Sequence, residues 1–209
     1  MTDKARIDNS IDATWHERAV PHPFLSGTGL RPAAFFDRDG VINIDHGYVH
    51  TADRLDLIEG AAATLRRCRD AGFLVFVVTN QSGIARGYFN ETALVGFHDH
   101  LRVMLAEQGA TIDDIRYCPH HRDAVVPAYQ RACDWRKPGP GMILDLARAW
   151  QVDLSRSFLI GDKTTDMEAA TAAGITGYLF DSGDLLAFVD PILDQISHSI
   201  TNDAHSENL

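Results

Sequence analysis

A short apolar segment that ends in two carboxylates constrains this chain more than any other feature. Residues 33–36 read Ala-Ala-Phe-Phe, and Asp37, Arg38, Asp39 and Gly40 follow directly. The apolar run predicts a buried strand, and the glycine predicts its end. Open α/β sheets build their sites at the carboxyl ends of strands. Because residues two apart on an extended chain point the same way, both carboxylates can face one ligand.

Two carboxylates this close repel each other unless a cation joins them or one of them is protonated. Both remedies suit a phosphate ester, since Mg²⁺ binds phosphate and a protonated acid releases the leaving group. The formal net charge of −10 argues against binding to a nucleic-acid backbone. The segments near the predicted site nevertheless carry Arg38, Arg86, Arg136, Lys137 and Lys163. An acidic chain with cations around one cleft suits a small anionic substrate.

The length and composition are those of an ordinary globular protein. The 209 residues are 45% hydrophobic and 23% charged, which suits one domain with a sizeable core. Three cysteines argue against a disulfide framework. The sequence has no apolar run of membrane-spanning length and no signal-peptide core, so we expect a cytoplasmic protein without a membrane partner. We expect an N-terminal arm over 1–30, a catalytic domain over 31–196 and a flexible polar tail over 197–209.

Apolar strands alternate with helical segments along the chain. We expect strands at 33–36, 73–78, 112–117, 157–160 and 176–180, and helices at 60–71, 90–108, 140–150 and 165–174. This alternation predicts an α/β fold of Rossmann-like type, with a mainly parallel sheet and helices on both faces. No insertion is long enough to fold as a separate cap domain. The polar segment 43–56 is expected to cover the first strand end as a flap.

The polar residues at the predicted strand ends are those that a phosphatase needs. Asp37 is the candidate nucleophile, which would attack phosphorus and form an aspartyl-phosphate. Asp39 is the candidate acid and base, which would protonate the leaving oxygen and then activate water. Thr79 and Asn80, with the backbone N–H groups of their turn, are candidates to hold phosphoryl oxygens. Lys137 is the candidate to neutralise the charge of the transition state.

Two further carboxylates complete a possible metal site. Asp162 follows the predicted strand 157–160 and can bind Mg²⁺, while Asp166 lies one helical turn further and can support the metal indirectly. Any one of these motifs alone is weak, because such short patterns are common in turns. All of them in this order, mostly after apolar strands, predict an enzyme.

The chain resembles the haloacid dehalogenase (HAD) superfamily of phosphohydrolases over residues 33–180. The motifs that carry the resemblance are Asp37-Arg38-Asp39-Gly40, Thr79-Asn80, Lys137, and Gly161-Asp162 through Asp166. The resemblance implies an Mg²⁺-dependent reaction through an aspartyl-phosphate. It also implies that Asp37, the backbone carbonyl of Asp39, and Asp162 bind the metal.

A finer resemblance is to the D-glycero-D-manno-heptose 1,7-bisphosphate 7-phosphatase family, which is related to the histidinol-phosphate phosphatases. It is carried by residues 45–50 (Asp-His-Gly-Tyr-Val-His), 79–87 (Thr-Asn-Gln-Ser-Gly-Ile-Ala-Arg-Gly), 117–121 (Tyr-Cys-Pro-His-His) and 136–138 (Arg-Lys-Pro). It implies a small sugar bisphosphate as substrate and a fold without a cap. The expected substrate-binding residues are Arg38, Asp45, His46, Gly47, Tyr48, Thr79, Asn80, Gln81, Ser82, Arg86, Arg136 and Lys137. The guanidinium of Arg136 suits the second phosphate.

One departure from this family concerns zinc. The family usually carries a Cys-x-His pair and then a Cys-x-Cys pair, and this chain has Cys118, His120 and Cys133, but Trp135 in the fourth place. A structural zinc ion is bound by four ligands, and a tryptophan side chain cannot act as a zinc ligand. Three outcomes are open. His121 or Asp134 supplies the fourth bond, water completes a weaker site, or the metal is absent and the tryptophan packs to hold the loop.

Other functions compete with this reading. A histidinol-phosphate phosphatase and a 3′-phosphatase acting on nucleic-acid ends use related motifs, although the net charge weighs against the second. A phosphotransferase would pass the phosphoryl group to an acceptor other than water. A protein of another class, an inactive phosphosugar-binding protein, would keep the fold without turnover. We expect a monomeric phosphatase that binds no nucleic acid.

Overall fold

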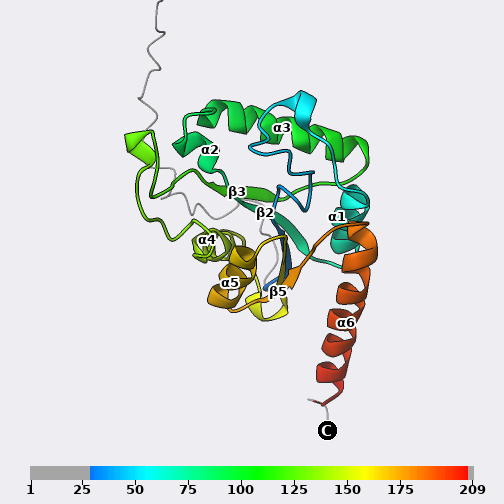
Figure 1. Ribbon diagram of the computed structural model, residues 1–209. Helices are drawn as coiled ribbons and strands as arrows, with labels where there is room; N and C mark the ends of the chain where they lie inside the picture. The colour runs from blue at the N-terminus through cyan, green and yellow to red at the C-terminus, as the bar shows by residue number, and fades with distance from the viewer. Residues whose placement is uncertain (1–28, 207–209) are drawn as a thin grey trace, which may run out of the picture.

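The protein folds around one parallel sheet. In the computed structural model the backbone is described for residues 29–206 and the side chains for residues 29–196. The strands are β1 (Ala33–Phe36), β2 (Leu74–Asn80), β3 (Asp114–Cys118), β4 (Phe158–Gly161) and β5 (Thr176–Leu179). Their order in the sheet is β3-β2-β1-β4-β5, and every neighbouring pair is parallel (Figure 1).

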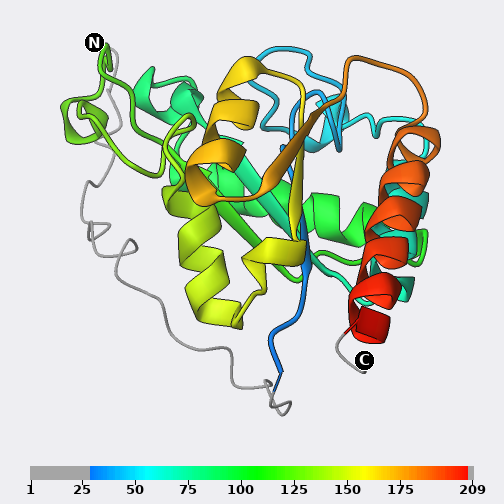
Figure 2. The same ribbon diagram turned by 90° about the horizontal axis from the view of Figure 1, so that it is seen from below.

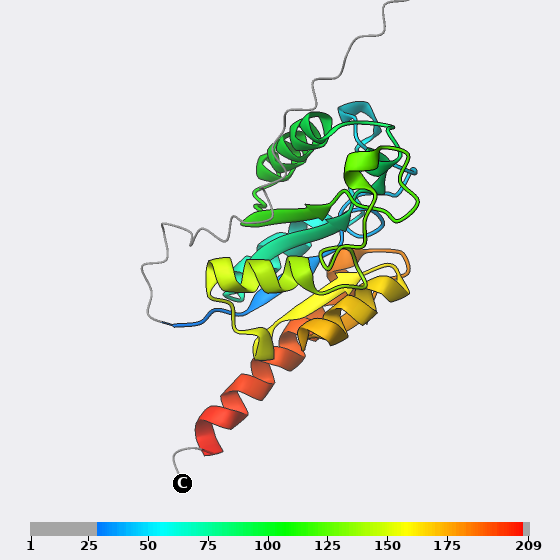
Figure 3. The same ribbon diagram turned by 90° about the vertical axis from the view of Figure 1, so that its left-hand side faces the viewer.

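Helices cover both faces of this sheet. The α-helices are α1 (Ala61–Asp70), α2 (Ser82–Ala85), α3 (Glu91–Glu107), α4 (Gly141–Trp150), α5 (Thr164–Ala173) and α6 (Leu185–Ser206). Short 3₁₀ turns are η2 (Ala52–Arg54), η3 (Pro127–Tyr129) and η4 (Leu154–Arg156). Helices α1, α3 and α6 pack on one face, and α4 and α5 pack on the other (Figures 2 and 3). The predicted α/β class with helices on both faces is therefore confirmed.

The central strand positions the site. All four residues of β1 are buried, with Phe35 in the core under α4 and α5 and Phe36 in the core under α1, α3 and α6. A strand buried on both faces must be apolar throughout, which is why it reads as a continuous run. Phe36 pairs with Val77 of β2 and Ile160 of β4, so the carboxyl ends of the three strands lie side by side.

A long loop follows β1 and returns over the end of the sheet. Residues 43–58 contain the η2 turn as their one helical element, and Val49 and Leu55 anchor them in the core beside α1 and α3. Asn43 bridges to both Asp39 and Leu57, which closes the loop at its base. This flap therefore lies over the strand end, as the polar segment 43–56 predicts.

Two elements differ from the sequence-based expectation. Thr79 and Asn80, predicted as the start of a turn, still belong to β2, and the helical turn α2 follows them. The helix α6 was not predicted, and its backbone continues to Ser206, past residue 197 where we expected a polar tail to begin. The expected N-terminal arm lies, except for its last two residues, outside the described part. Among the described helices, none is both long and apolar enough to span a membrane.

Candidate active site

The carboxyl edge of the sheet opens into a cavity of about 400 Å³. Three neighbouring strands supply its floor, and the flap and the loop before α4 supply its walls. The lining residues are Asp37, Asp39, Asp45, Gly47, Tyr48, Thr79, Asn80, Gln81, Ser82, Gly83, Arg136, Lys137, Lys163 and Thr165. The four motifs that lie far apart in the sequence thus meet in one place, because parallel strands end at the same edge.

Asp37 and Lys137 form the centre of this cavity. The Lys137 Nζ lies 2.9 Å from Asp37 Oδ1 and 2.5 Å from Asp166 Oδ1, and all three side chains are buried. Burial raises the pKa of the Asp37 carboxyl, and Lys137 opposes that shift. Burial acts to lower the pKa of Lys137, but Asp37 and Asp166 raise it above its ordinary value. The ammonium therefore stays charged beside the carboxylate, as stabilisation of a phosphoryl group requires.

The acidic residues around Asp37 fit a divalent cation. Oxygens of Asp37, Asp162 and Asp166 lie within 4.8 Å of one another. Burial and the nearby Asp37 raise the pKa of Asp162, whose Oδ1 is buried without a hydrogen-bond partner in the described structure. Hard carboxylate oxygens are the ligands that Mg²⁺ prefers, and a buried carboxylate oxygen without a hydrogen-bond partner is free to bind the ion. The residues present thus fit Mg²⁺.

Asp39 is held by three neighbouring side chains. The Arg38 guanidinium donates to Asp39 Oδ1 at 2.9 Å and to Oδ2 at 2.8 Å. Asn43 donates to Oδ1 and Gln81 donates to Oδ2, each at 3.0 Å. These bonds fix the carboxylate at the cavity wall. They also show that Gln81, expected to touch substrate, holds the candidate acid as well as lining the cavity.

Arg38 does not contact the cavity, contrary to expectation. Its side chain is fully buried behind Asp39, where it also donates to the Val49 carbonyl at 2.7 Å and lies 3.1 Å from His98 Nε2. The guanidinium carbon lies 4.6 Å from the ring centre of Phe97. Arg38 therefore cannot reach a substrate, and it connects Asp39 to the flap and to α3.

Asn80 also has a different place from the one predicted. Its side chain donates to the backbone carbonyl of Lys137 and accepts from the backbone N–H of Lys137, each at 3.0 Å. The amide thus uses both ends to fix the lysine, although it still lines the cavity. Thr79 lies beside it, buried, and accepts a hydrogen bond from Gln81 at 2.9 Å.

The flap and the loop before α4 form the outer cavity. Asp45, Gly47, Tyr48 and Arg136 line it, and so does Ser82 at the start of α2. Of the described residues expected to bind substrate, Arg38, His46 and Arg86 stand outside this lining. The imidazole of His46 lies 2.7 Å from Asp56 on the exposed side of the flap.

The cavity contains Lys163, a cation that the sequence analysis placed near the site but gave no individual role. Lys163 Nζ lies 3.2 Å from Asp162 Oδ2 and 3.5 Å from Asp45 Oδ2, so it links the flap to β4. Its place directly after Gly161-Asp162 explains why it lies here, because the residue after a strand-end carboxylate is carried to the same edge.

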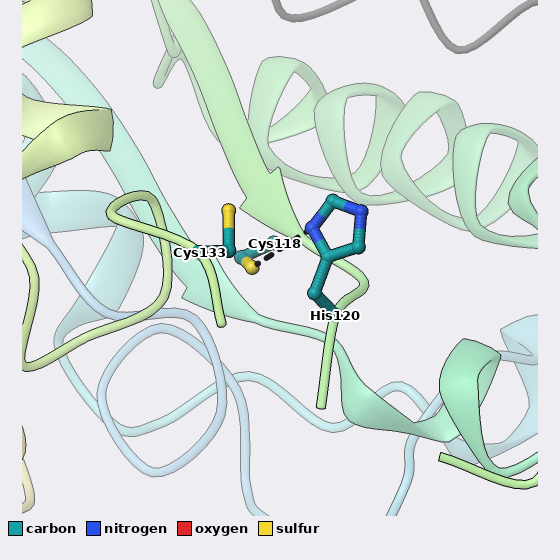
Figure 4. Close-up of side chains that lie close together, drawn as sticks. All are labelled: Cys118, His120 and Cys133. Carbon is teal, nitrogen blue, oxygen red and sulfur yellow. Dashed lines mark hydrogen bonds between the residues drawn. The ribbon is translucent and has the colours of Figure 1, made fainter. Parts of the chain in front are cut away.

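Cys118, His120 and Cys133 come together, as the family resemblance implies. Their ligand atoms lie within 4.8 Å of one another, beside the end of β3 (Figure 4). The Cys118 Sγ lies 3.7 Å from His120 Nδ1. Cys133 accepts hydrogen bonds from Cys118 and from the backbone N–H of Trp135, and these bonds lower its pKa.

This cluster does not match a closed zinc site. Among the described residues it holds three candidate ligands, and neither His121 nor Asp134 joins it. The Trp135 side chain packs with the core under α4 and α5, and its Cδ1 would lie 2.7 Å from a Cβ atom at Gly141. Of the three outcomes that the sequence leaves open, this geometry does not match the one in which His121 or Asp134 supplies the fourth bond, because it gives no fourth protein ligand among the described residues.

The fold and the site define the class of HAD-like phosphatases. The HAD-hydrolase-like family model matches residues 134–187. The D-glycero-β-D-manno-heptose-1,7-bisphosphate 7-phosphatase of Rhodopseudomonas palustris is 52% identical over 169 residues, which are 81% of this chain and 94% of that protein. The protein of that name from Escherichia coli K12 is 44% identical over 144 residues, 69% of this chain and 75% of that protein. The chain therefore belongs to the heptose-1,7-bisphosphate 7-phosphatase family of HAD-like phosphatases.

A solved structure of the family shares the fold. The D,D-heptose 1,7-bisphosphate phosphatase of B. bronchiseptica, complexed with magnesium and phosphate, is 34% identical with a TM-score of 0.65. The match covers 77% of this chain and 86% of that one. Fold, class and family thus agree with the resemblance that the motifs indicate.

Proposed function

We propose that this phosphatase removes the 7-phosphate from D-glycero-β-D-manno-heptose 1,7-bisphosphate, with Mg²⁺ as its cofactor. The observation that carries the proposal is the buried Asp37–Lys137 pair, placed in one cavity with Asp39 and with polar flap residues above it. The names of the relatives support the sugar bisphosphate as the substrate class.

The chemistry follows from the position of each side chain. Asp37 attacks the phosphorus atom and forms an aspartyl-phosphate, while Asp39 protonates the leaving sugar oxygen. Asp39 then takes a proton from water, which attacks the phosphorus atom and restores the Asp37 carboxylate. Lys137 and the backbone N–H groups after Thr79 stabilise the negative oxygens in both steps.

The carboxylates near Asp37 would hold the metal. Asp37, Asp162 and the Asp39 carbonyl would bind Mg²⁺, with Asp166 holding Lys137 behind them. Bound there, the ion supplies positive charge to the phosphate oxygens. The ion also offsets the repulsion between carboxylates that burial otherwise makes costly.

The outer cavity would take the sugar and the second phosphate. Asp45 and Tyr48 present a carboxylate and a phenol, which suit sugar hydroxyls. Arg136 is half-buried, and burial together with the neighbouring Arg86 lowers its pKa. A phosphate that approached these guanidinium groups would be attracted by both.

The test is phosphate release from a small panel, measured with and without Mg²⁺. The panel holds both anomers of the heptose bisphosphate, histidinol phosphate and a 3′-phosphorylated oligonucleotide. We expect Mg²⁺-dependent release with preference for the β anomer. Preference for histidinol phosphate or for the oligonucleotide would overturn the substrate assignment, and release without Mg²⁺ would overturn the cofactor assignment.

The matched variant is Asp37→Asn, which keeps the volume of the side chain and removes its charge. Loss of the nucleophile should lower turnover by at least about 10⁴-fold without lowering the melting temperature. Turnover near the wild-type rate in this variant would show that Asp37 is not the nucleophile.

A further inference from the structure

Two ring contacts join the flap to the segment between α2 and α3. The rings of Tyr48 and Tyr88 meet edge to face, with centroids 4.8 Å apart and an angle of 78°. The rings of His50 and Phe89 stack, with centroids 4.4 Å apart and an angle of 14°. One side of each pair belongs to the flap, and the other side belongs to two consecutive residues that the reaction does not use.

Tyr48 has a backbone conformation that a residue with a bulky side chain rarely adopts. Its φ of 51° is in the left-handed region, which is uncommon for a residue with a bulky side chain. Its carbonyl accepts a hydrogen bond from His50 Nδ1 at 2.6 Å. Tyr48 and Tyr88 are 42% and 57% exposed, so burial in the core does not explain their pairing.

Phe89 contacts the other wall of the cavity as well. A Cβ atom at Gly83 would lie 2.3 Å from Phe89 Cε1, so the ring sits directly against the backbone of α2. Gly83 lines the cavity beside Ser82. The phenyl ring is therefore in contact with the flap through His50 and with the cavity wall at α2 through Gly83.

We propose that Tyr88 and Phe89 are positioning residues that determine substrate specificity. They hold the flap residues Asp45–Tyr48 at a fixed distance from the phosphoryl site. A sugar bisphosphate of the right size can then contact the flap and the phosphoryl site at the same time. The proposal rests on the proposed function for the identity of the sugar. The aromatic side chains act through Tyr48 and His50, since neither Tyr88 nor Phe89 lines the cavity.

This role separates two kinds of substrate. A small aryl phosphate such as p-nitrophenyl phosphate needs the phosphoryl site alone, whereas a sugar bisphosphate must also contact the flap. Loss of a ring contact with the flap should therefore weaken binding of the sugar bisphosphate and leave turnover of the aryl phosphate unchanged. A purely structural role for the rings would lower the turnover of both substrates together.

The experiment compares Tyr88→Ala and Phe89→Ala with the conservative variants Tyr88→Phe and Phe89→Leu. Each alanine variant should raise KM for the heptose bisphosphate about tenfold, the scale of one lost aromatic contact, with kcat within about twofold. Turnover of p-nitrophenyl phosphate should not change in Tyr88→Ala, whereas Phe89→Ala also removes the packing on Gly83 and has Phe89→Leu as its control. Tyr88→Phe keeps the ring and should behave as wild type. Phe89→Leu keeps an apolar side chain packed on Gly83 but loses the ring stack with His50.

Hydrogen exchange of the flap provides a readout that needs no sugar. Amides of residues 45–50 should exchange faster in both alanine variants, with no change in the strands. Equal losses on both substrates, or unchanged KM and exchange, would overturn the proposal. If the wild type cleaves p-nitrophenyl phosphate but not the heptose bisphosphate, the proposed function fails, and the exchange data still decide whether the rings hold the flap.

Discussion

Arg38 shows how a buried cation can serve a site that it does not touch. It gives both oxygens of Asp39 a hydrogen bond and is itself held by the Val49 carbonyl and by His98. Burial and the nearby Arg38 hold the pKa of His98 well below its ordinary value, so the imidazole stays neutral. The guanidinium therefore has one carboxylate partner in this network, and it fixes the position of that carboxylate.

The variant Arg38→Lys tests this role. Lysine keeps the charge but loses the planar fork that meets both oxygens of Asp39, so the acid should be poorly aligned. Turnover of sugar phosphates, whose leaving groups need a proton, should fall by up to about 100-fold. Turnover of p-nitrophenyl phosphate, whose leaving group needs none, should fall much less. Equal losses on both substrates would mean that Arg38 serves the fold and does not align the acid.

The tryptophan beside the Cys–His–Cys cluster offers a second test at a single residue. Trp135→Cys would add a thiol two residues after Cys133, whose sulfur already accepts a hydrogen bond from the backbone N–H of residue 135. We expect tighter Zn²⁺ binding than in the wild type, measured by metal content after dialysis against a chelator. The variant Trp135→Ser is the control, since it removes the same ring without adding a thiolate. Equal metal content in both variants would contradict the prediction.

At the scale of elements, α6 completes the core on one face of the sheet. Leu185, Val189 and Leu193 are fully buried against α1 and the sheet. Arg67 of α1 forms ion pairs with Asp190 and Asp194 at the edge of the same interface. The apolar side chains are expected to supply most of the stability here, because exposed ion pairs contribute little.

Replacement of one buried leucine measures that contribution. Leu193→Ala should lower the free energy of unfolding by about 2–5 kcal/mol, since the cavity it leaves cannot fully close. Arg67→Ala on the same interface should cost less than about 1 kcal/mol per ion pair. Urea unfolding of both variants gives the comparison. A larger loss for Arg67→Ala would show that the ion pairs hold α6 in place.

At the scale of the whole molecule, the free energy of unfolding should fall as the pH becomes alkaline. Burial raises the pKa of Cys68 from 9.0 to about 12, because the thiolate has no place in the apolar core. The folded state thus keeps a proton that the unfolded state loses above pH 9.0. Burial and the bond to Glu91 also raise the pKa of Tyr117.

The sign of the effect follows from this difference in bound protons. The contribution of Cys68 is complete below pH 9.0 and is lost as the pH rises toward about 12, at about 1.4 kcal/mol per pH unit. Urea midpoints measured across this window should therefore fall, and they should fall less steeply in Cys68→Ala. The same slope in the variant and the wild type would assign the pH dependence to other groups.

The sequence by itself determined the class of fold, and it predicted which polar residues follow the strand ends. Asp37 and Asp162 could be recognised because each directly follows an apolar strand, and parallel strands bring their carboxyl ends together. Lys137 lies in the loop before α4 and was recognised from the order of the motifs. The aromatic contacts of Tyr88 and Phe89 have no such pattern, because they depend on how the flap folds back.

Only the tertiary structure decided which polar residues face the cavity. Arg38 lies between two site residues in sequence, yet its side chain turns into the core, because Asp39, Val49 and His98 satisfy it there. Spacing along the chain says which strand end a residue reaches, and it does not say which partners the side chain finds. Those partners come from segments distant in the sequence, so their contacts exist only once the chain has folded.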